Sequence, residues 1–233
     1  MVKVLPMKIY KFFDNVDYAV KAVKENRIRL SRFDSLNDPF ELLSTQQKSR
    51  SHRVLDKKKL QEINENYGLA CFSNRYTSVL MWSHYAKGVG ACLEFQASDD
   101  LLLPVEYIAN KRIEREVEKQ SKSKINIDTV KAIAKYKSIH WSYEQEVRLI
   151  TNLNQHPSEP SGYDNQRNFF LTLDQNLYLT GFIFGPQDSN VSESAMKSIQ
   201  ILNPSLEVSH ARIAFNSFIV LKRRDKILAS HKK

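Results

Sequence analysis

The sequence has few cysteines and no long hydrophobic segment. Cys71 and Cys92 are the only cysteines among 233 residues, and both lie in apolar runs. This placement predicts buried free thiols in a reducing compartment, and no cysteine and histidine spacing matches a metal site. No apolar run approaches the ~20 residues of a membrane span, and residues 1–10 lack the apolar core of a signal peptide. We therefore expect a cytoplasmic protein with no metal site and no membrane association.

The composition is that of a globular protein with a large excess of positive charge. Hydrophobic residues make up 42% of the chain and aromatic residues 10%, and the net charge is +9. This charge predicts an anionic partner, which is a nucleic acid, a dinucleotide or an acidic protein. The length allows one large domain or two small ones. Because no linker or internal repeat is evident, we predict a single domain over residues 1–233 with a basic tail at 222–233.

Segments with strand-like and helix-like patterns follow one another along the chain, which predicts a fold that contains both. We expect the α+β class, with mixed or antiparallel sheets and flanking helices. Helices are predicted from the cap Asn15 to about Asn26 and over 46–67, 77–86, 111–137 and 192–202. Strands are predicted over 8–13, 27–32, 68–73, 91–95, 101–107, 169–173 and 178–184. The last two strands, 206–213 and 217–222, are expected to form a hairpin, and residues 155–168 a long loop.

The stretch from His140 to Ile150 concentrates the charged residues that are most suggestive of chemistry. Its sequence predicts a strand after Tyr143, in which alternation places Glu144, Glu146 and Arg148 on one face. Two carboxylates and a guanidinium would then converge on one place. The alternative is a surface strand on which Glu144 and Arg148 form only an ion pair.

Two other motifs carry polar and aromatic side chains. Asn-Asp-Pro-Phe-Glu at 37–41 predicts a turn that opens a short helix, whose first N–H groups would bind an anion. Met-Trp-Ser-His-Tyr-Ala at 81–86 lies in a predicted helix and contributes Trp82, His84 and Tyr85. Such aromatic residues are more often core packing than ligand platforms, and His84 is expected to be half-buried and hydrogen-bonded.

Taken together, three motifs resemble a widespread bacterial family of uncharacterised domains that is often found in mobile or defence-associated genes. They are residues 37–41, residues 81–86 preceded by Cys-Phe-Ser at 71–73, and Trp-Ser-Tyr-Glu-Gln-Glu-Val-Arg at 141–148. The resemblance extends over roughly residues 9–185. The order of elements is also similar to the ADP-ribosyltransferase fold, especially that of DNA-targeting ADP-ribosyltransferase toxins.

This second resemblance implies a site for NAD. Tyr10 or Lys11 would stand on the first strand where that fold carries a histidine, Ser73 on the second strand, and Glu146 on the late strand. Glu146 would stabilise the cation-like ribose formed when the nicotinamide bond breaks, and Glu144 would orient the acceptor or act as its base. The remaining residues implied to bind NAD are Arg148, Arg32 and Lys8 at the pyrophosphate, Trp82 or Tyr85 at the nicotinamide, and His84 beside them. Asn37, Asp38 and Glu41 would contact the acceptor.

The resulting function is an NAD-using ADP-ribosyltransferase or NAD glycohydrolase, a toxin or phage-defence effector that modifies nucleic acid or protein. Nucleic acid, a partner protein and an antitoxin are its candidate partners. This function requires Glu146 to face a cleft. One alternative is a non-catalytic module, a sensor or adaptor of a defence system, that binds nucleic acid or a partner protein with steep salt dependence. Another is a metal-dependent nuclease using Asp38, Glu41, Glu144 and Glu146.

Overall fold

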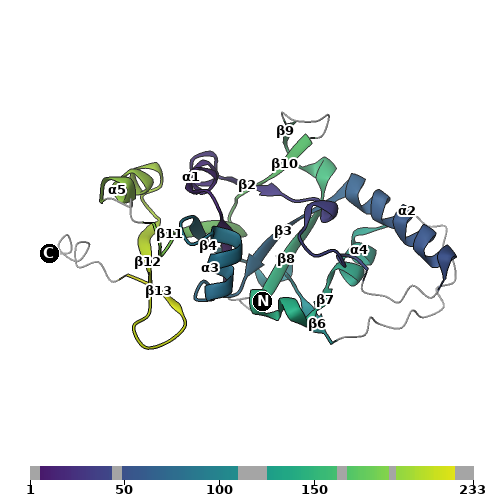
Figure 1. Ribbon diagram of the computed structural model, residues 1–233. Coiled ribbons are helices and arrows are strands. Elements are labelled where there is room, and N and C mark those ends of the chain that lie inside the picture. The colour runs from purple at the N-terminus through teal and green to yellow at the C-terminus, as the bar shows by residue number, and fades with distance from the viewer. Residues whose placement is uncertain (1–5, 44–48, 110–124, 162–166, 189–192, 224–233) are drawn as a thin grey trace, which may run out of the picture. The chain divides into compact units, whose positions relative to one another are not determined.

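The computed structural model describes residues 6–43, 49–109, 125–161, 167–188 and 193–223, which contain both α-helices and strands (Figure 1). These confirm the α+β class. The chain divides into two compact units, each built from separate segments. Unit 1 comprises residues 1–27, 72–99 and 173–233, and unit 2 comprises residues 28–71 and 100–172. The single domain expected from the sequence stays a prediction, and most of the basic tail, 224–233, lies outside the described residues.

Unit 1 is built on a mixed sheet. Its strands lie in the order β13-β12-β11-β4-β1, and the end of β3 lies beside β1 through the pair Tyr10 and Ser73. β11 and β12 are parallel, while β4 runs antiparallel to both β1 and β11. The mixed sheet predicted for this part of the chain is therefore confirmed. The strands are β1 (Met7–Phe13), β3 (Tyr67–Ser73), β4 (Ala91–Ala97), β11 (Leu177–Phe184), β12 (Glu207–Ile213) and β13 (Val220–Lys222).

Three helices accompany this sheet: α1 (Val16–Glu25), α3 (Val79–Ala86) and α5 (Glu193–Leu202). Helix α1 begins where the sequence predicts, because the Asn15 side chain accepts a hydrogen bond from the Asp17 amide. It ends at Asn26, whose left-handed backbone (φ 50°) lets its N–H reach the last turn. Both predicted ends of this helix are confirmed.

One apolar cluster of unit 1 lies between α3 and the sheet. It joins residues from α3 and from five strands or strand ends: Tyr10, Trp82, Ala86, Cys92, Ile183, Ala211 and Val220. Gly90 makes the turn from α3 into β4 possible, since a Cβ there would lie 1.9 Å from the Phe13 carbonyl oxygen. The backbones of β1 and this turn approach too closely for any side chain.

In its described residues, unit 2 has three groups of strands and two helices. β3 lies beside β8, which pairs with β5; β2, β10 and β9 form a second group; and β6 and β7 are parallel. The helices are α2 (Arg50–Asn66) and α4 (Ile127–Ala134). The strands are β2 (Arg27–Leu30), β5 (Leu103–Pro104), β6 (Glu106–Ile108), β7 (Tyr136–Ser138), β8 (Glu146–Asn152), β9 (Ser158–Pro160) and β10 (Arg167–Thr172). Short 3-10 helices are η1 (Phe33–Ser35), η2 (Asp99–Leu101), η3 (Ile139–Glu144) and η4 (Leu153–Gln155).

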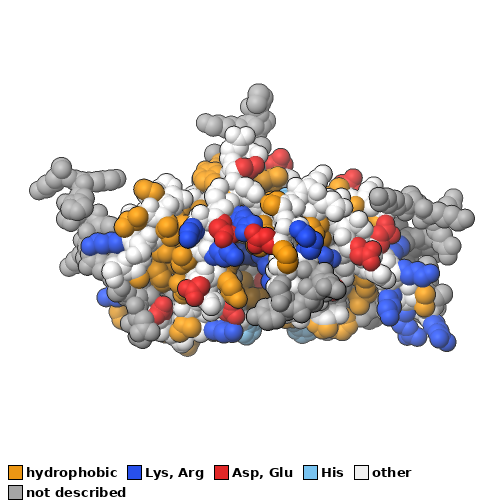
Figure 2. Space-filling view, turned by 90° about the horizontal axis from the view of Figure 1, so that it is seen from above, with side chains coloured by type: hydrophobic (Ala, Val, Ile, Leu, Met, Phe, Trp, Pro, Cys, Tyr) orange, Lys and Arg blue, Asp and Glu red, His pale blue; other side chains and the backbone are white. Residues whose placement is uncertain are grey.

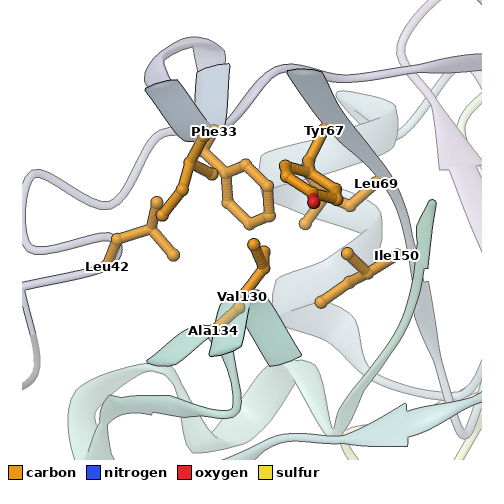
Figure 3. Packing of buried hydrophobic residues seen from close by; sticks show 8 residues of the cluster. Phe33, Leu42, Tyr67, Leu69, Val130, Ala134 and Ile150 are labelled. Carbon is orange, nitrogen blue, oxygen red and sulfur yellow. The ribbon is translucent and has the colours of Figure 1, made fainter. Parts of the chain in front are cut away.

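The apolar core of unit 2 gathers side chains from α2, α4, β3, β8 and the segment that follows β2. Figure 3 shows Phe33, Tyr67, Val130 and Ile150 directed toward a common centre. The full cluster is Phe33, Leu42, Ile63, Tyr67, Leu69, Val130, Ala134 and Ile150. Burial of this apolar surface fixes α4 against β8, which places the end of α4 beside the residues described in the next section.

Several expected element boundaries are wrong. The strand expected over 101–107 is two short strands, β5 and β6, separated at Val105. The long helix expected over 111–137 is present as α4 only, residues 136–138 form β7, and residues 110–124 lie outside the described part. The loop expected over 155–168 contains the strand β9, with residues 162–166 outside that part. No helix in the described ranges has the length and apolarity to cross a bilayer.

Candidate functional site

The two glutamates of the 140–150 stretch lie on different elements. Glu144 is the last residue of η3 and Glu146 the first residue of β8, and Gln145 between them has a left-handed backbone (φ 45°). The expected strand face carrying Glu144, Glu146 and Arg148 is therefore wrong for Glu144. It is right for Glu146 and Arg148, whose side chains meet along β8. The left-handed residue turns the chain so that both carboxylates still converge.

Arg148 is the centre of a buried ion network in unit 2. Its side chain has 0% exposure, and Nε donates to Glu146 Oε1 at 2.8 Å. The two terminal nitrogens donate to both oxygens of Glu41, at 2.6 and 2.9 Å. They also donate to Glu146 Oε2 at 3.1 Å and to the Ala134 carbonyl at 2.7 Å. All five N–H donors of the guanidinium are thus used inside the protein.

Lys137, from β7, is the second cation of the network. Its ammonium donates to Oε2 of Glu144 and, at 3.1 Å, to Oε2 of Glu146. The ammonium also lies 4.8 Å from the centre of the Trp141 ring. The side chains of Lys137, Glu144 and Glu146 are all buried, and Glu146 is only 5% exposed. The ion network consists of Glu41, Lys137, Glu144, Glu146 and Arg148.

Electrostatics within the network keep its members charged. Burial alone would raise the pKa of Glu146, but Arg148 and Lys137 outweigh it and lower that pKa to about 2. Burial alone would lower the pKa of Lys137, because it disfavours the charged ammonium. The charges of Glu146 and Glu144 outweigh burial and raise that pKa. The Tyr107 hydroxyl accepts a hydrogen bond from the Glu146 amide, and burial raises its pKa to about 12. Among the described residues, the network joins three carboxylates to two cations.

The 37–41 motif supplies one member of this network. Glu41 is buried and bonded to Arg148, so the first and third sequence motifs meet. The helix expected to begin at Pro39 is absent, because residues 39–42 form turns. Asp38 is buried and accepts a hydrogen bond from the Phe40 amide at 2.9 Å, which occupies an N–H of the expected anion site. Asn37 is exposed.

Arg32 also has an internal role in unit 2. Its guanidinium donates to the Asn64 carbonyl at 2.6 Å and lies 5.6 Å from the centre of the Phe169 ring. It thus ties α2 to the segment after β2 and stacks on β10. The pyrophosphate role expected from the sequence would compete with both contacts.

In unit 1, Ser73, Tyr10 and Glu94 form a row across three neighbouring strands. Tyr10 of β1 lies opposite Ser73 of β3 on one side and opposite Glu94 of β4 on the other. Residues opposite one another in antiparallel strands share a face, so the three side chains occupy one face of the sheet. The expected first-strand and second-strand positions are therefore adjacent. Ser73 is fully buried, and its hydroxyl bonds to the backbone of Arg75.

Glu94 is a buried carboxylate that is held by two lysines. One oxygen accepts from Lys8 at 2.8 Å and from the Thr180 hydroxyl at 3.1 Å, and the other accepts from Lys222 at 3.1 Å. Burial opposes ionisation, but both lysines outweigh it and lower the pKa of Glu94. Burial and the charge of Glu94 raise the pKa of Tyr10. Lys8, expected at a pyrophosphate, is instead the partner of Glu94.

The aromatic helix serves packing. Trp82 is buried, its indole N–H donates to the Tyr76 carbonyl at 2.6 Å, and its ring packs edge-on against Phe12 at 5.2 Å. The expected role of Trp82 as a stacking platform is therefore wrong. Tyr85 is half-buried, and His84, expected to be half-buried, is exposed. The Lys11 ammonium lies 5.8 Å from the centre of the Phe72 ring.

Sequence reasoning missed Lys137 and Glu94. Glu94 had a local signal, since it is a lone acid in the otherwise apolar strand Ala-Cys-Leu-Glu-Phe at 91–95. Lys137 had none, because it was assigned to the end of a long charged helix. Both cysteines are free thiols as expected, but only Cys92 is buried; Cys71 is half-buried.

The carboxylates of the ion network are paired with protein cations. Among the residues with described positions, no group of three or more His, Cys, Asp or Glu side chains is arranged to hold a metal ion. The oxygens of Glu41 and Glu146 instead accept hydrogen bonds from Arg148 and Lys137. A cation already occupies the position that a metal ion would need.

No family model, curated protein or solved structure matches the chain. The resemblances drawn from the three motifs and from the order of elements stay predictions.

Proposed function

We propose that the protein binds nucleic acid through its phosphates and that the basic part of α2 is the contact surface. The observation that carries the proposal is the charge of residues 50–59. They include five cationic residues and a single acid, Asp56. Figure 2 shows Lys and Arg side chains gathered at the right of the view, where α2 lies in Figure 1.

The helical repeat gathers part of this charge on one side. Arg50, Arg53 and Lys57 are spaced by three and four residues, so they share one face of α2, and all three are exposed. Ile63, later in the helix, packs into the core of unit 2. Guanidinium and ammonium groups on an exposed helix neutralise successive phosphates and release their counterions. The excess of +9 over the whole chain acts in the same direction.

The ion network supports binding over catalysis. The carboxylate that the enzymatic prediction requires in a cleft, Glu146, is buried and paired on both oxygens. Removing a partner from such a network is strongly destabilising, which is the property of a structural element. Glu146 and Arg148 lie on β8, and Lys137 follows α4 in the chain, so the network joins these parts of unit 2 and stabilises it.

The test is the binding of a labelled DNA duplex, measured by fluorescence anisotropy over a range of salt concentrations. Lys57→Glu combined with Lys58→Glu should weaken binding by about tenfold or more and make the slope of log K against log [salt] shallower by about two. Lys21→Glu with Lys24→Glu on α1 is the matched control, because each pair changes the net charge by −4, from +9 to +5. Equal losses in both variants, or no binding by the wild type, would contradict the proposal.

A second candidate is the NAD-using ADP-ribosyltransferase, which the row of Ser73, Tyr10 and Glu94 favours. In this reaction the bond between ribose C1′ and nicotinamide breaks, nicotinamide leaves with the electron pair, and an acceptor oxygen or nitrogen bonds to C1′ and loses its proton. The candidate requires Glu146 to leave Lys137 and Arg148 when NAD binds. Incubation with NAD and DNA, RNA or protein should release nicotinamide from the wild type and not from Glu146→Gln. Absence of turnover with every acceptor would remove this candidate.

A further inference from the structure

The connection between β12 and β13 exposes two phenylalanines almost completely. Phe215 is 95% and Phe218 99% exposed. The connection forms the open yellow loop beyond the two strands in Figure 1. Burying a side chain of this size is worth about 1.5–3 kcal/mol, so its full exposure forgoes that stabilisation. Two such residues in one loop indicate a binding surface.

The base of this loop is firmly attached to unit 1. β12 and β13 pair through Ile213 and Val220, Val220 is buried in the core, and its amide donates to the Thr77 carbonyl at 3.0 Å. The Ala214 amide donates to the Ile219 carbonyl at 3.0 Å and closes the loop. The aromatic rings are therefore presented from an ordered hairpin.

The charge around the rings is positive. Residues 208–223 contain no Asp or Glu, and they include Arg212, Lys222 and Arg223. The Arg212 guanidinium carbon lies 5.1 Å from the centre of the Phe215 ring. A guanidinium stacked on a ring in this way keeps its N–H groups at the edge, where one of them donates to the Ile213 carbonyl. Lys222 is already paired with Glu94 and Glu207, so Arg212 is the cation of this surface on which the proposal relies.

We propose that the hairpin loop of Phe215 and Phe218, with Arg212, binds single-stranded nucleic acid by stacking on unpaired bases while the arginine contacts phosphate. Every base has a π face, so aromatic stacking accepts any sequence and contributes about 1–3 kcal/mol per base. In a duplex the bases are paired and stacked on one another, so a duplex would make only the contact between its phosphates and the arginine. This inference rests on the proposed nucleic-acid binding and adds the strand state and a second contact surface.

Charge selects this ligand over a second copy of the chain. Two copies would bring together two loops that carry only positive charge, in molecules of +9 each. A polyanion with flat apolar groups complements both the arginine and the rings.

The experiment uses the full chain and three labelled probes: an oligothymidylate of about 20 nucleotides, the same backbone without bases, and a duplex. Phe215→Ala with Phe218→Ala should weaken binding to the oligothymidylate by about tenfold or more. It should leave binding to the abasic strand and the duplex within about twofold. Tyr18→Ala is the matched control, since Tyr18 is an exposed aromatic residue on α1 of the same unit. Because both phenylalanines are exposed, the thermal midpoint of the double variant should be unchanged.

Several results would overturn the inference. One is equal binding of the oligothymidylate by the wild type and the phenylalanine variant. Another is loss of binding to anionic phospholipid vesicles, or of self-association, in the phenylalanine variant while oligonucleotide binding is kept. If the Lys57 and Lys58 variant loses duplex binding but the phenylalanine variant loses nothing, the inference fails and the proposed function stands. If the wild type binds no nucleic acid, both fail.

Discussion

Replacing Arg148 by methionine tests the buried ion network directly. Methionine fills much of the same volume but donates no hydrogen bond, so the change removes charge with little loss of packing. Glu41 loses the cation that both of its oxygens accept from, and Glu146 retains only Lys137. Leaving a buried charge without its partner costs about 3–5 kcal/mol. We expect the free energy of unfolding at pH 7 to fall by this amount.

The loss of unfolding free energy caused by Arg148→Met should depend on pH. The pKa of Glu146 is lowered to about 2 from an ordinary value of 4.5, so its contribution to stability is full above pH 4.5 and is lost as the pH falls through 2. In the variant, Glu146 lacks the Arg148 charge that lowers its pKa, so it can protonate at a higher pH and relieve the buried charge. The difference between wild type and variant should therefore be largest at pH 7 and smaller at pH 4.

Urea unfolding followed by circular dichroism measures this difference, with the slope against urea checked for each protein. Arg29→Met is the matched control, because Arg29 is an exposed residue on β2 whose loss changes the net charge equally. It should cost less than about 0.5 kcal/mol. A deficit below about 1 kcal/mol for Arg148→Met, or an equal deficit at both pH values, would refute the energetic role given to the network.

Three further outcomes are expected. Acidification from pH 4.5 to 2 should remove about 3 kcal/mol of stability that Glu146 contributes, and a urea titration of Glu146→Gln should lack this part of the acid dependence. Gly90→Ala should destabilise the protein by about 1–3 kcal/mol or more, because the added Cβ would meet the Phe13 carbonyl oxygen; an unchanged thermal midpoint would contradict this. Asn15→Ala should cost about 1 kcal/mol by removing the acceptor for the Asp17 amide, and hydrogen exchange should increase in the first turn of α1.

Local patterns predicted the elements that depend on neighbouring residues. The cap at Asn15, the end of α1 at Asn26 and the terminal hairpin of β12 and β13 follow from a few adjacent side chains and are confirmed. The alternation of a strand also placed Glu146 and Arg148 together. Each of these features depends on a few residues that are close together in the sequence.

The candidate site depended on contacts that no local pattern contains. Glu41 and Arg148 are 107 positions apart, and their bonding follows from the packing of the unit 2 core. Lys137 reaches Glu144 and Glu146 only because β7 replaces the end of an expected helix. The left-handed backbone at Gln145 breaks the strand period and moves Glu144 onto a separate element.

The division of the chain between the two units sets the order in which they can be completed during translation. All of unit 2 has been synthesised when Thr172 leaves the peptidyl transferase centre, whereas unit 1 begins with β1 and still lacks Val220, a member of its core. β1 can pair with β4 once residue 97 has been made, but the apolar cluster that contains Tyr10 is complete only after Val220. Nascent chains paused once residue 172 has cleared the ribosomal tunnel should protect the amides of β8 more strongly than those of β1 and β4.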